Sequence, residues 1–242
     1  MFDARLFQTL GILLVLALPA LFLTTNVRVA FQSQALYTYA IDAFDAPERT
    51  GVEREELIRG TAGLIRYFES DEDLITTEII VNGRSEPLFT EREALHFRDV
   101  RDLLRRVYSV QAAAAVFVLA GVLAAVLALA WRRPGAAAII SARLRQSAVG
   151  TVIVIISVGI FAALGGFNFL FLQFHLLSFS NDLWQGQATD RMIQLFPQAF
   201  FLQATLLIGL AAIIEMAVVW LCATLILRRV RRAAARLAQP ND

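Results

Sequence analysis

The chain has 242 residues, of which 57% are hydrophobic, and its mean hydropathy is +0.60 with a formal net charge of +1. This composition excludes an ordinary water-soluble domain and favours an integral membrane protein. The basic residues are all arginine, which excludes Schiff-base chemistry by lysine, and a single cysteine, Cys222, excludes an intrachain disulfide. Because the arginine clusters lie beside apolar segments, where membrane topology explains them, we expect no nucleic-acid partner.

Four apolar stretches, residues 6–23, 109–131, 149–172 and 199–227, are long enough to cross a hydrocarbon core about 30 Å thick. Each should be helical, because an isolated spanning segment must satisfy its backbone hydrogen bonds internally. We therefore divide the chain into transmembrane helix 1 (1–23), an extracytoplasmic domain (24–108), transmembrane helix 2 (109–131), a cytoplasmic loop (132–148), transmembrane helix 3 (149–172), an extracytoplasmic loop (173–198), transmembrane helix 4 (199–227) and a cytoplasmic tail (228–242).

The distribution of charge predicts the orientation of these helices. Residues 132–147 contain four arginines and no acidic residue, and the tail from 228 contains five arginines and one aspartate, whereas residues 24–108 contain 11 arginines and 16 acidic residues. The positive-inside rule then puts both termini and the middle loop in the cytoplasm. Arg105 and Arg106, at the outer end of the second helix, depart from this pattern. Snorkelling to the membrane interface is the favoured explanation, and contact with lipid phosphates is the functional alternative.

Residues 24–69 contain one clear helical signal. Thr50-Gly-Val-Glu53 has the pattern of a capping box, and the apolar residues after it recur at helical spacing to about Glu69. The sequence therefore predicts an amphipathic helix that begins at this motif.

The rest of the first outer segment predicts a hairpin and a long helix. Ile79–Val81 is typical of a short strand, and Asn82-Gly83 is a strong signal for a tight hairpin turn. Thr90-Glu-Arg-Glu93 is a second capping box, and no glycine or proline interrupts the residues from 91 to 120. The expected fold is an all-α membrane protein: four transmembrane helices with a mostly helical extracytoplasmic domain that contains a short β-hairpin.

The chain has only two histidines, and both lie on the predicted outer side. His96 is on the helix that leads into transmembrane helix 2, with Glu93 three residues before it and Asp99 three residues after it. This spacing places the three side chains on one helical face, so either carboxylate could orient the imidazole. The competing interpretation is an exposed histidine with ordinary charged neighbours.

His175 follows the third apolar stretch, where aromatic residues are frequent. Phe174, Phe179 and Trp184 suit a membrane interface, and an ionisable residue at this depth is a functional candidate. An interfacial histidine without a function is the alternative. Glu215, inside transmembrane helix 4, is interpreted as a protonated or hydrogen-bonded packing contact rather than an ion-pathway residue, because the helices contain no second buried charge.

Two chemistries are open to a pair of histidines on neighbouring outer elements. The first is acid–base catalysis, because imidazole titrates near neutral pH. The second is a metal site made of His96, His175 and a carboxylate such as Glu93 or Asp99. The sequence has no HExxH or CxxC motif and no histidine cluster, so we favour acid–base chemistry and expect no metal or other cofactor.

Three motifs occur together. Leu36-Tyr37 follows the first helix, and Glu93-x-x-His96-x-x-Asp99-Val100 precedes the second. The third motif is Phe174-His175-x-x-x-Phe179, followed by Asn181, Trp184, Asp190, Ile193, Phe196-Pro197 and Phe200-Phe201. This set resembles the lipoprotein intramolecular transacylases, the Lit family of bacterial membrane proteins. The chain departs from the family pattern at 186–188, where an Asp-Pro step is common, and at Gln198, where an acidic residue is usual.

The resemblance implies an acyltransferase of the bacterial cell membrane with its active site at the outer face. Its substrate would be a lipoprotein whose N-terminal cysteine carries a diacylglyceryl thioether, and the sn-2 acyl chain would move to the cysteine amine to leave a lyso-form lipoprotein. We expect a monomer that contacts membrane lipid. The resemblance implies catalytic residues His96 and His175, orienting residues Glu93 and Asp99, and substrate-binding residues Phe174, Phe179, Trp184, Arg105 and Arg106.

The main alternative is a non-enzymatic membrane sensor or partner-binding protein with an extracytoplasmic domain. Imidazoles that lie far apart would favour this alternative, whereas imidazoles that lie close together would favour the enzyme. A third interpretation, a metal-dependent membrane hydrolase, predicts that activity is lost on chelation.

Overall fold

The computed structural model describes residues 4–130 and 134–237. Four segments are long and apolar enough to cross a membrane: α1 (Ala4–Gln32), α5 (Glu91–Ala130), α6 (Pro134–Phe161) with its continuation into α7 (Phe167–Ser178), and α9 (Gln198–Leu237). The remaining elements are short helices and one hairpin. The predicted fold class is therefore confirmed. The chain divides into two compact units, the first made of residues 1–26, 109–159 and 209–242 and the second of residues 27–108 and 160–208.

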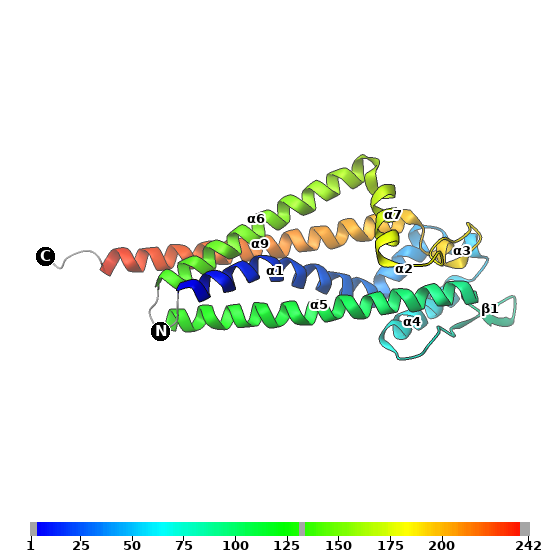
Figure 1. Cartoon of the computed structure of the whole chain (residues 1–242). Helices are drawn as coiled ribbons and strands as arrows, with labels where there is room; N and C mark the ends of the chain where they lie inside the picture. Colours follow the sequence, from blue (N-terminus) through cyan, green and yellow to red (C-terminus); the bar gives the residue numbers. More distant parts are fainter. Residues whose placement is uncertain (1–3, 131–133, 238–242) are drawn as a thin grey trace. The chain divides into compact units, whose positions relative to one another are not determined.

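The first unit is a bundle formed by the apolar parts of α1, α5, α6 and α9, which lie side by side (Figure 1). Leu18 of α1 packs with Ala148 of α6 and Met216 of α9. At Gly121 of α5, an added Cβ would stand 2.6 Å from the side chain of Leu14, so the small residue lets the two helices approach closely. Large apolar side chains on the outside of the bundle are exposed, as expected for surfaces that face lipid.

Two pairs of polar side chains join helices of the first unit. Asn26 Nδ2 donates to a carboxylate oxygen of Glu215 at 2.9 Å, and Gln111 Nε2 donates to Thr25 Oγ1 at 2.9 Å. Unpaired polar groups are costly in hydrocarbon, so these bonds stabilise the contacts between helices. Glu215 is thus a hydrogen-bonded packing contact, as its isolation in the sequence predicted.

A kink separates α6 from α7. Residues Ala162–Gly166 form a π-helical segment, η1, in which Gly165 has φ +97°. Only glycine adopts this conformation without steric cost, so the kink has a backbone cause. The kink starts α7, which is the helix that carries His175.

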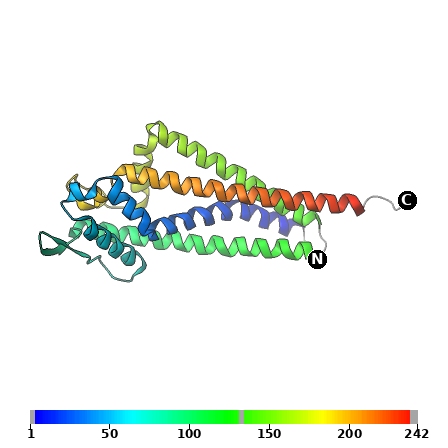
Figure 2. The same ribbon diagram turned by 180° about the vertical axis from the view of Figure 1, so that it is seen from behind.

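The second unit contains α2 (Gln34–Ala43), α3 (Ala46–Thr50), α4 (Arg54–Glu69), β1 (Glu78–Val81), β2 (Arg84–Pro87) and α8 (Arg191–Leu195). One hydrophobic core joins them, and fully buried Leu57 and Leu64 of α4 meet Ile79 and Leu88 of the hairpin region in it. Figure 2 shows α4 beside the hairpin, in the cyan to teal part of the chain. The first turns of α5 belong to this unit and share its core.

The hairpin forms at the predicted position. Strands β1 and β2 pair antiparallel with Val81 opposite Arg84, and the two turn residues Asn82 and Gly83 have φ +50° and +76°. Positive φ at both central residues is the geometry that Asn-Gly favours in two-residue hairpin turns.

One of the two predicted capping boxes is wrong. Thr50 is the last residue of α3, and its hydroxyl donates to the Ala46 carbonyl at 2.7 Å, while α4 begins after Glu53 without a side-chain cap. The second box forms: Thr90 Oγ1 accepts from the Glu93 backbone N–H at 3.3 Å, and Glu93 Oε2 accepts from the Thr90 backbone N–H at 2.7 Å. This box fixes the start of α5, the helix that carries His96.

Candidate active site

His96 lies on the charged first part of α5, before the apolar run that is suited to a membrane. The side chain is 6% exposed, and its Nδ1 has no hydrogen-bond partner among the described residues. Burial, and to a smaller extent positive charge on His175, lower the pKa of the imidazole to about 4, although the Asp99 carboxylate opposes the shift. His96 is therefore neutral at physiological pH.

His175 lies in the last turn of α7 and is 8% exposed. Its Nδ1 lies 2.7 Å from the backbone carbonyl oxygen of Phe171, four residues earlier on the same helix. A carbonyl oxygen can only accept, so a neutral His175 carries its proton on Nδ1 and donates it to Phe171. This bond fixes the tautomer and leaves the lone pair on Nε2, which is the atom that can accept a proton.

The two imidazoles meet at one phenylalanine ring. The Phe179 ring centroid lies 5.2 Å from that of His96 and 5.8 Å from that of His175. On other sides of His175, the Phe171 and Trp184 rings lie at 4.3 Å and 4.8 Å. The structure thus brings together two buried histidines that are distant in the sequence, within an aromatic enclosure where electrostatic interactions are stronger than in water.

Glu93 does not hydrogen-bond either imidazole. Its carboxylate is 2% exposed and accepts from the Thr90 backbone N–H and hydroxyl at 2.7 and 2.8 Å and from the Met192 backbone N–H at 2.7 Å. Glu93 therefore joins the start of α5 to α8, three residues away from His96 on the same helix.

We expect Glu93→Ala to destabilise the second unit, because it leaves two backbone N–H groups without an acceptor. The expected cost is about 2–3 kcal/mol, the range for a buried donor that loses a charged acceptor. A lower melting temperature of the purified protein in detergent would show this loss. The control is Glu91→Ala, which removes an exposed acidic residue from the same turn. Equal melting temperatures for the two variants would contradict the assignment.

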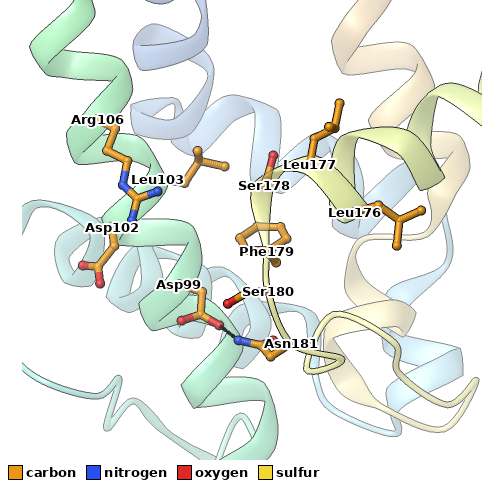
Figure 3. Close-up of a pocket in the computed structure, with 10 residues that line it drawn as sticks. All are labelled: Asp99, Asp102, Leu103, Arg106, Leu176, Leu177, Ser178, Phe179, Ser180 and Asn181. Carbon is orange, nitrogen blue, oxygen red and sulfur yellow. Dashed lines mark hydrogen bonds between the residues drawn. The ribbon is translucent and has the colours of Figure 1, made fainter.

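Asp99 faces the segment that follows α7 rather than the His96 ring. Its Oδ2 accepts from Asn181 Nδ2 at 2.8 Å, and Figure 3 shows the two side chains pointing toward each other. They border a groove of about 340 Å³ that Phe179 also lines. The groove is lined by Asp99, Asp102, Leu103, Arg106, Leu176, Leu177, Ser178, Phe179, Ser180 and Asn181.

The other predicted substrate-binding residues have different surroundings. Arg105 forms an ion pair with Asp71 at 2.6 Å and donates to the Ser70 carbonyl at 2.8 Å, so it anchors the loop after α4. Arg106 lines the groove (Figure 3). Phe174 is half-exposed and contacts His175, and Trp184 stacks on the same imidazole.

Sequence reasoning missed two groups that shape the site. The Phe171 carbonyl sets the tautomer of His175, and its only signal was its place four residues before the histidine. Arg92, which donates to the Asp182 carbonyl at 2.8 Å, had no signal at all, because its partner is a backbone atom of a distant segment. Within residues 4–130 and 134–237, no group of three or more His, Cys, Asp or Glu side chains is placed to hold a metal ion.

Four apolar spans and two buried histidines enclosed by aromatic rings define a multi-pass membrane protein with a candidate acid–base site. A sequence model of the lipoprotein intramolecular transacylase family, Lit, matches residues 12–201. The chain belongs to this family, which makes it an intramolecular transacylase and therefore an enzyme. No curated protein matches the chain in sequence.

Solved structures of the same family share the fold. The membrane-integral lipoprotein intramolecular transacylase Lit from Bacillus cereus is 19% identical, with a TM-score of 0.75 over 95% of this chain and 100% of that chain. Two variants of that protein, with one histidine replaced by arginine or alanine, match with TM-scores of 0.73 and 0.70 at 19% and 18% identity. The first covers 96% of each chain, and the second covers 96% of this chain and 98% of that chain. At these identities, the likeness concerns the fold.

Proposed function

We propose that the enzyme moves the sn-2 acyl chain of a diacylglyceryl-cysteine lipoprotein onto the α-amine of the same cysteine. The observation that carries this proposal is the meeting of two buried imidazoles at Phe179, with the lone pair of His175 Nε2 left free by the bond to Phe171. Family membership supports the substrate class.

The first step is attack by the amine nitrogen on the ester carbonyl carbon. The neutral form of the α-amine, whose conjugate acid has a pKa of about 8, attacks, and its nitrogen gains positive charge as the new N–C bond forms, so it must lose a proton. His175 Nε2 accepts this proton. The hydrogen bond from Nδ1 to Phe171 stabilises the imidazolium that results, as a fixed acceptor does for a general base.

The second step is cleavage of the ester C–O bond. The glyceryl oxygen leaves and takes the proton from the His175 imidazolium, so the products are an amide and a free hydroxyl with no net gain or loss of protons. Both reacting groups belong to one substrate molecule, so correct positioning supplies much of the acceleration.

His96 is suited to stabilise the carbonyl oxygen as negative charge develops on it. A neutral imidazole retains one N–H, and its low pKa keeps it in this form at physiological pH. A donor placed at the oxyanion lowers the barrier without a further proton transfer. The alternative role, proton delivery to the leaving oxygen, predicts a different response to glutamine substitution.

We place the site at the outer face of the membrane, with both termini in the cytoplasm. The support is the arginine excess of residues 132–147 and of the tail, against the acidic excess of residues 24–108. The exposed Leu176 and Leu177, which line the groove, and the exposed Phe174 of the same helix are suited to contact acyl chains.

The test is co-expression of the enzyme with a diacylated lipoprotein in a host that lacks N-acylation of lipoproteins. Mass spectrometry of the N-terminal peptide should show a lyso-form, with one acyl chain on the amine and one on the glyceryl group. A lipoprotein that keeps both ester-linked chains in the presence of folded wild-type enzyme would overturn the proposal.

A further inference from the structure

The segment that follows α7 places the ring between the two imidazoles. Helix α7 ends at Ser178, and Phe179 is extended (φ −126°, ψ 137°) with its backbone N–H donating to the His175 carbonyl at 3.0 Å. From Phe179 to Asp190 the chain has only turns and bends. Because no helix or strand holds this segment, its side-chain contacts decide where Phe179 lies.

Two side chains of α5 hold the segment. Asp99 accepts from the Asn181 amide at 2.8 Å, and Arg92 donates to the Asp182 carbonyl at 2.8 Å. Residues 92, 96 and 99 recur at spacings of four and three, which places them on one helical face. His96 therefore lies between the two anchoring points, on the face that the segment covers with Phe179.

The Asn181 side chain uses both ends of its amide. Nδ2 donates to Asp99, and Oδ1 accepts from the Leu183 backbone N–H at 3.0 Å, which shapes the turn at 181–183. A carboxylate can accept from Leu183 but cannot donate to Asp99, so an aspartate at 181 loses one of the two bonds. Asparagine is thus matched to both partners.

We propose that the Asn181–Asp99 hydrogen bond is a positioning contact that sets the separation of the His96 and His175 imidazoles through Phe179. This inference rests on the proposed function. Neither residue touches the reacting atoms. Asp99 acts as a hydrogen-bond acceptor for the segment, and its negative charge is not required. Four variants separate the role of the hydrogen bond from the role of the charge.

Asp99→Asn keeps an acceptor oxygen for Asn181 and removes the charge, whereas Asp99→Ala removes both. Asn181→Asp removes the donor and sets two carboxylates against each other. The double variant Asp99→Asn with Asn181→Asp exchanges the two groups, so that residue 99 donates and residue 181 accepts. Asp42→Ala is the matched control, because Asp42 is a half-exposed carboxylate that accepts from Arg54 elsewhere in the same unit.

The expected rate of each variant depends on whether it keeps the hydrogen bond between residues 99 and 181. Asn181→Asp and Asp99→Ala should lower the rate at saturating substrate by about ten- to hundredfold, the effect of a misplacement of roughly 1 Å, with little change in KM. Asp99→Asn and the exchanged double variant should stay within about threefold of the wild-type rate, because both keep a hydrogen bond between residues 99 and 181 and therefore keep the position of Phe179. Asp42→Ala should match the wild type. Equal losses in Asp99→Asn and Asp99→Ala, or no recovery in the double variant, would overturn the proposal.

Tryptophan fluorescence gives a readout that does not depend on activity. The Trp184 ring lies 4.8 Å from the His175 ring, so its emission reports the position of the segment. With the other two tryptophans, Trp131 and Trp220, replaced by phenylalanine, Asn181→Asp should shift this emission and the double variant should restore it. Unchanged emission in Asn181→Asp would refute the positioning contact. By contrast, wild-type enzyme that forms no lyso-form lipoprotein would refute the proposed function and leave the fluorescence result standing.

Discussion

His175→Asn should reduce transacylation by about 10³-fold, within the range of 10² to 10⁴ that general acid–base catalysis contributes. Asparagine can still donate from its side-chain amide to the Phe171 carbonyl, which His175 Nδ1 reaches at 2.7 Å. It has no basic nitrogen to replace Nε2. The variant therefore removes the proposed base and preserves the bond that holds the side chain. Quantitative mass spectrometry of the lipoprotein N-terminus, at several enzyme levels, would measure the loss.

The control for this variant is a measurement that shows that the aromatic surroundings of residue 175 remain folded. His175 is buried among Phe171, Phe179 and Trp184, so a cavity or an unpaired polar group could unfold the end of α7. His175→Asn and the wild type should have melting temperatures within a few degrees of each other. A correctly folded His175→Asn enzyme that keeps more than about a tenth of wild-type activity is too active for the loss of a general base, and it would remove His175 from this role.

Local sequence patterns predicted the turn and the helix cap that depend only on residues within the same short stretch of chain. The Asn82-Gly83 turn formed because both residues accept positive φ, and the Thr90–Glu93 box formed because its partners are three residues apart. The Thr50–Glu53 box has the same pattern and failed. Gly51, with φ +66°, ends α3 in the left-handed conformation, and the Thr50 hydroxyl is used by the helix that it closes. A pattern of four residues does not distinguish the end of one helix from the start of the next.

The site was less accessible to local reasoning. The spacing of Glu93, His96 and Asp99 predicts a common helical face, but it does not tell which partner each carboxylate selects. The Met192 backbone N–H binds Glu93 and the Asn181 amide binds Asp99, and both come from a distant part of the chain. A buried carboxylate accepts hydrogen bonds from the donors that the folded chain brings next to it. When these donors come from a distant segment, the local sequence does not identify them.

His96→Ala and His96→Gln should differ, and the difference identifies the role of this residue. Loss of an oxyanion donor lowers a rate by about 10²- to 10³-fold, so we expect a loss of that size for alanine. Glutamine retains a side-chain N–H and has no titratable nitrogen, so a hydrogen-bond donor role predicts that His96→Gln recovers at least about tenfold over His96→Ala. The two variants and the wild type are compared by initial rate at equal amounts of folded enzyme.

Proton delivery by His96 predicts equal losses in both variants, because neither side chain can carry an imidazolium. The buried, neutral state of His96 argues against this outcome: burial lowers the pKa of the ring to about 4, so the protonated form is scarce at neutral pH. If His175 alone carries the proton, the transacylation rate between pH 6 and 8 should not depend on the protonation of His96. The pH–rate profiles of the wild type and of His96→Gln test this. A pH dependence over this range that the wild type shows and His96→Gln lacks would instead make His96 a proton donor, and the site would be a two-histidine acid–base pair.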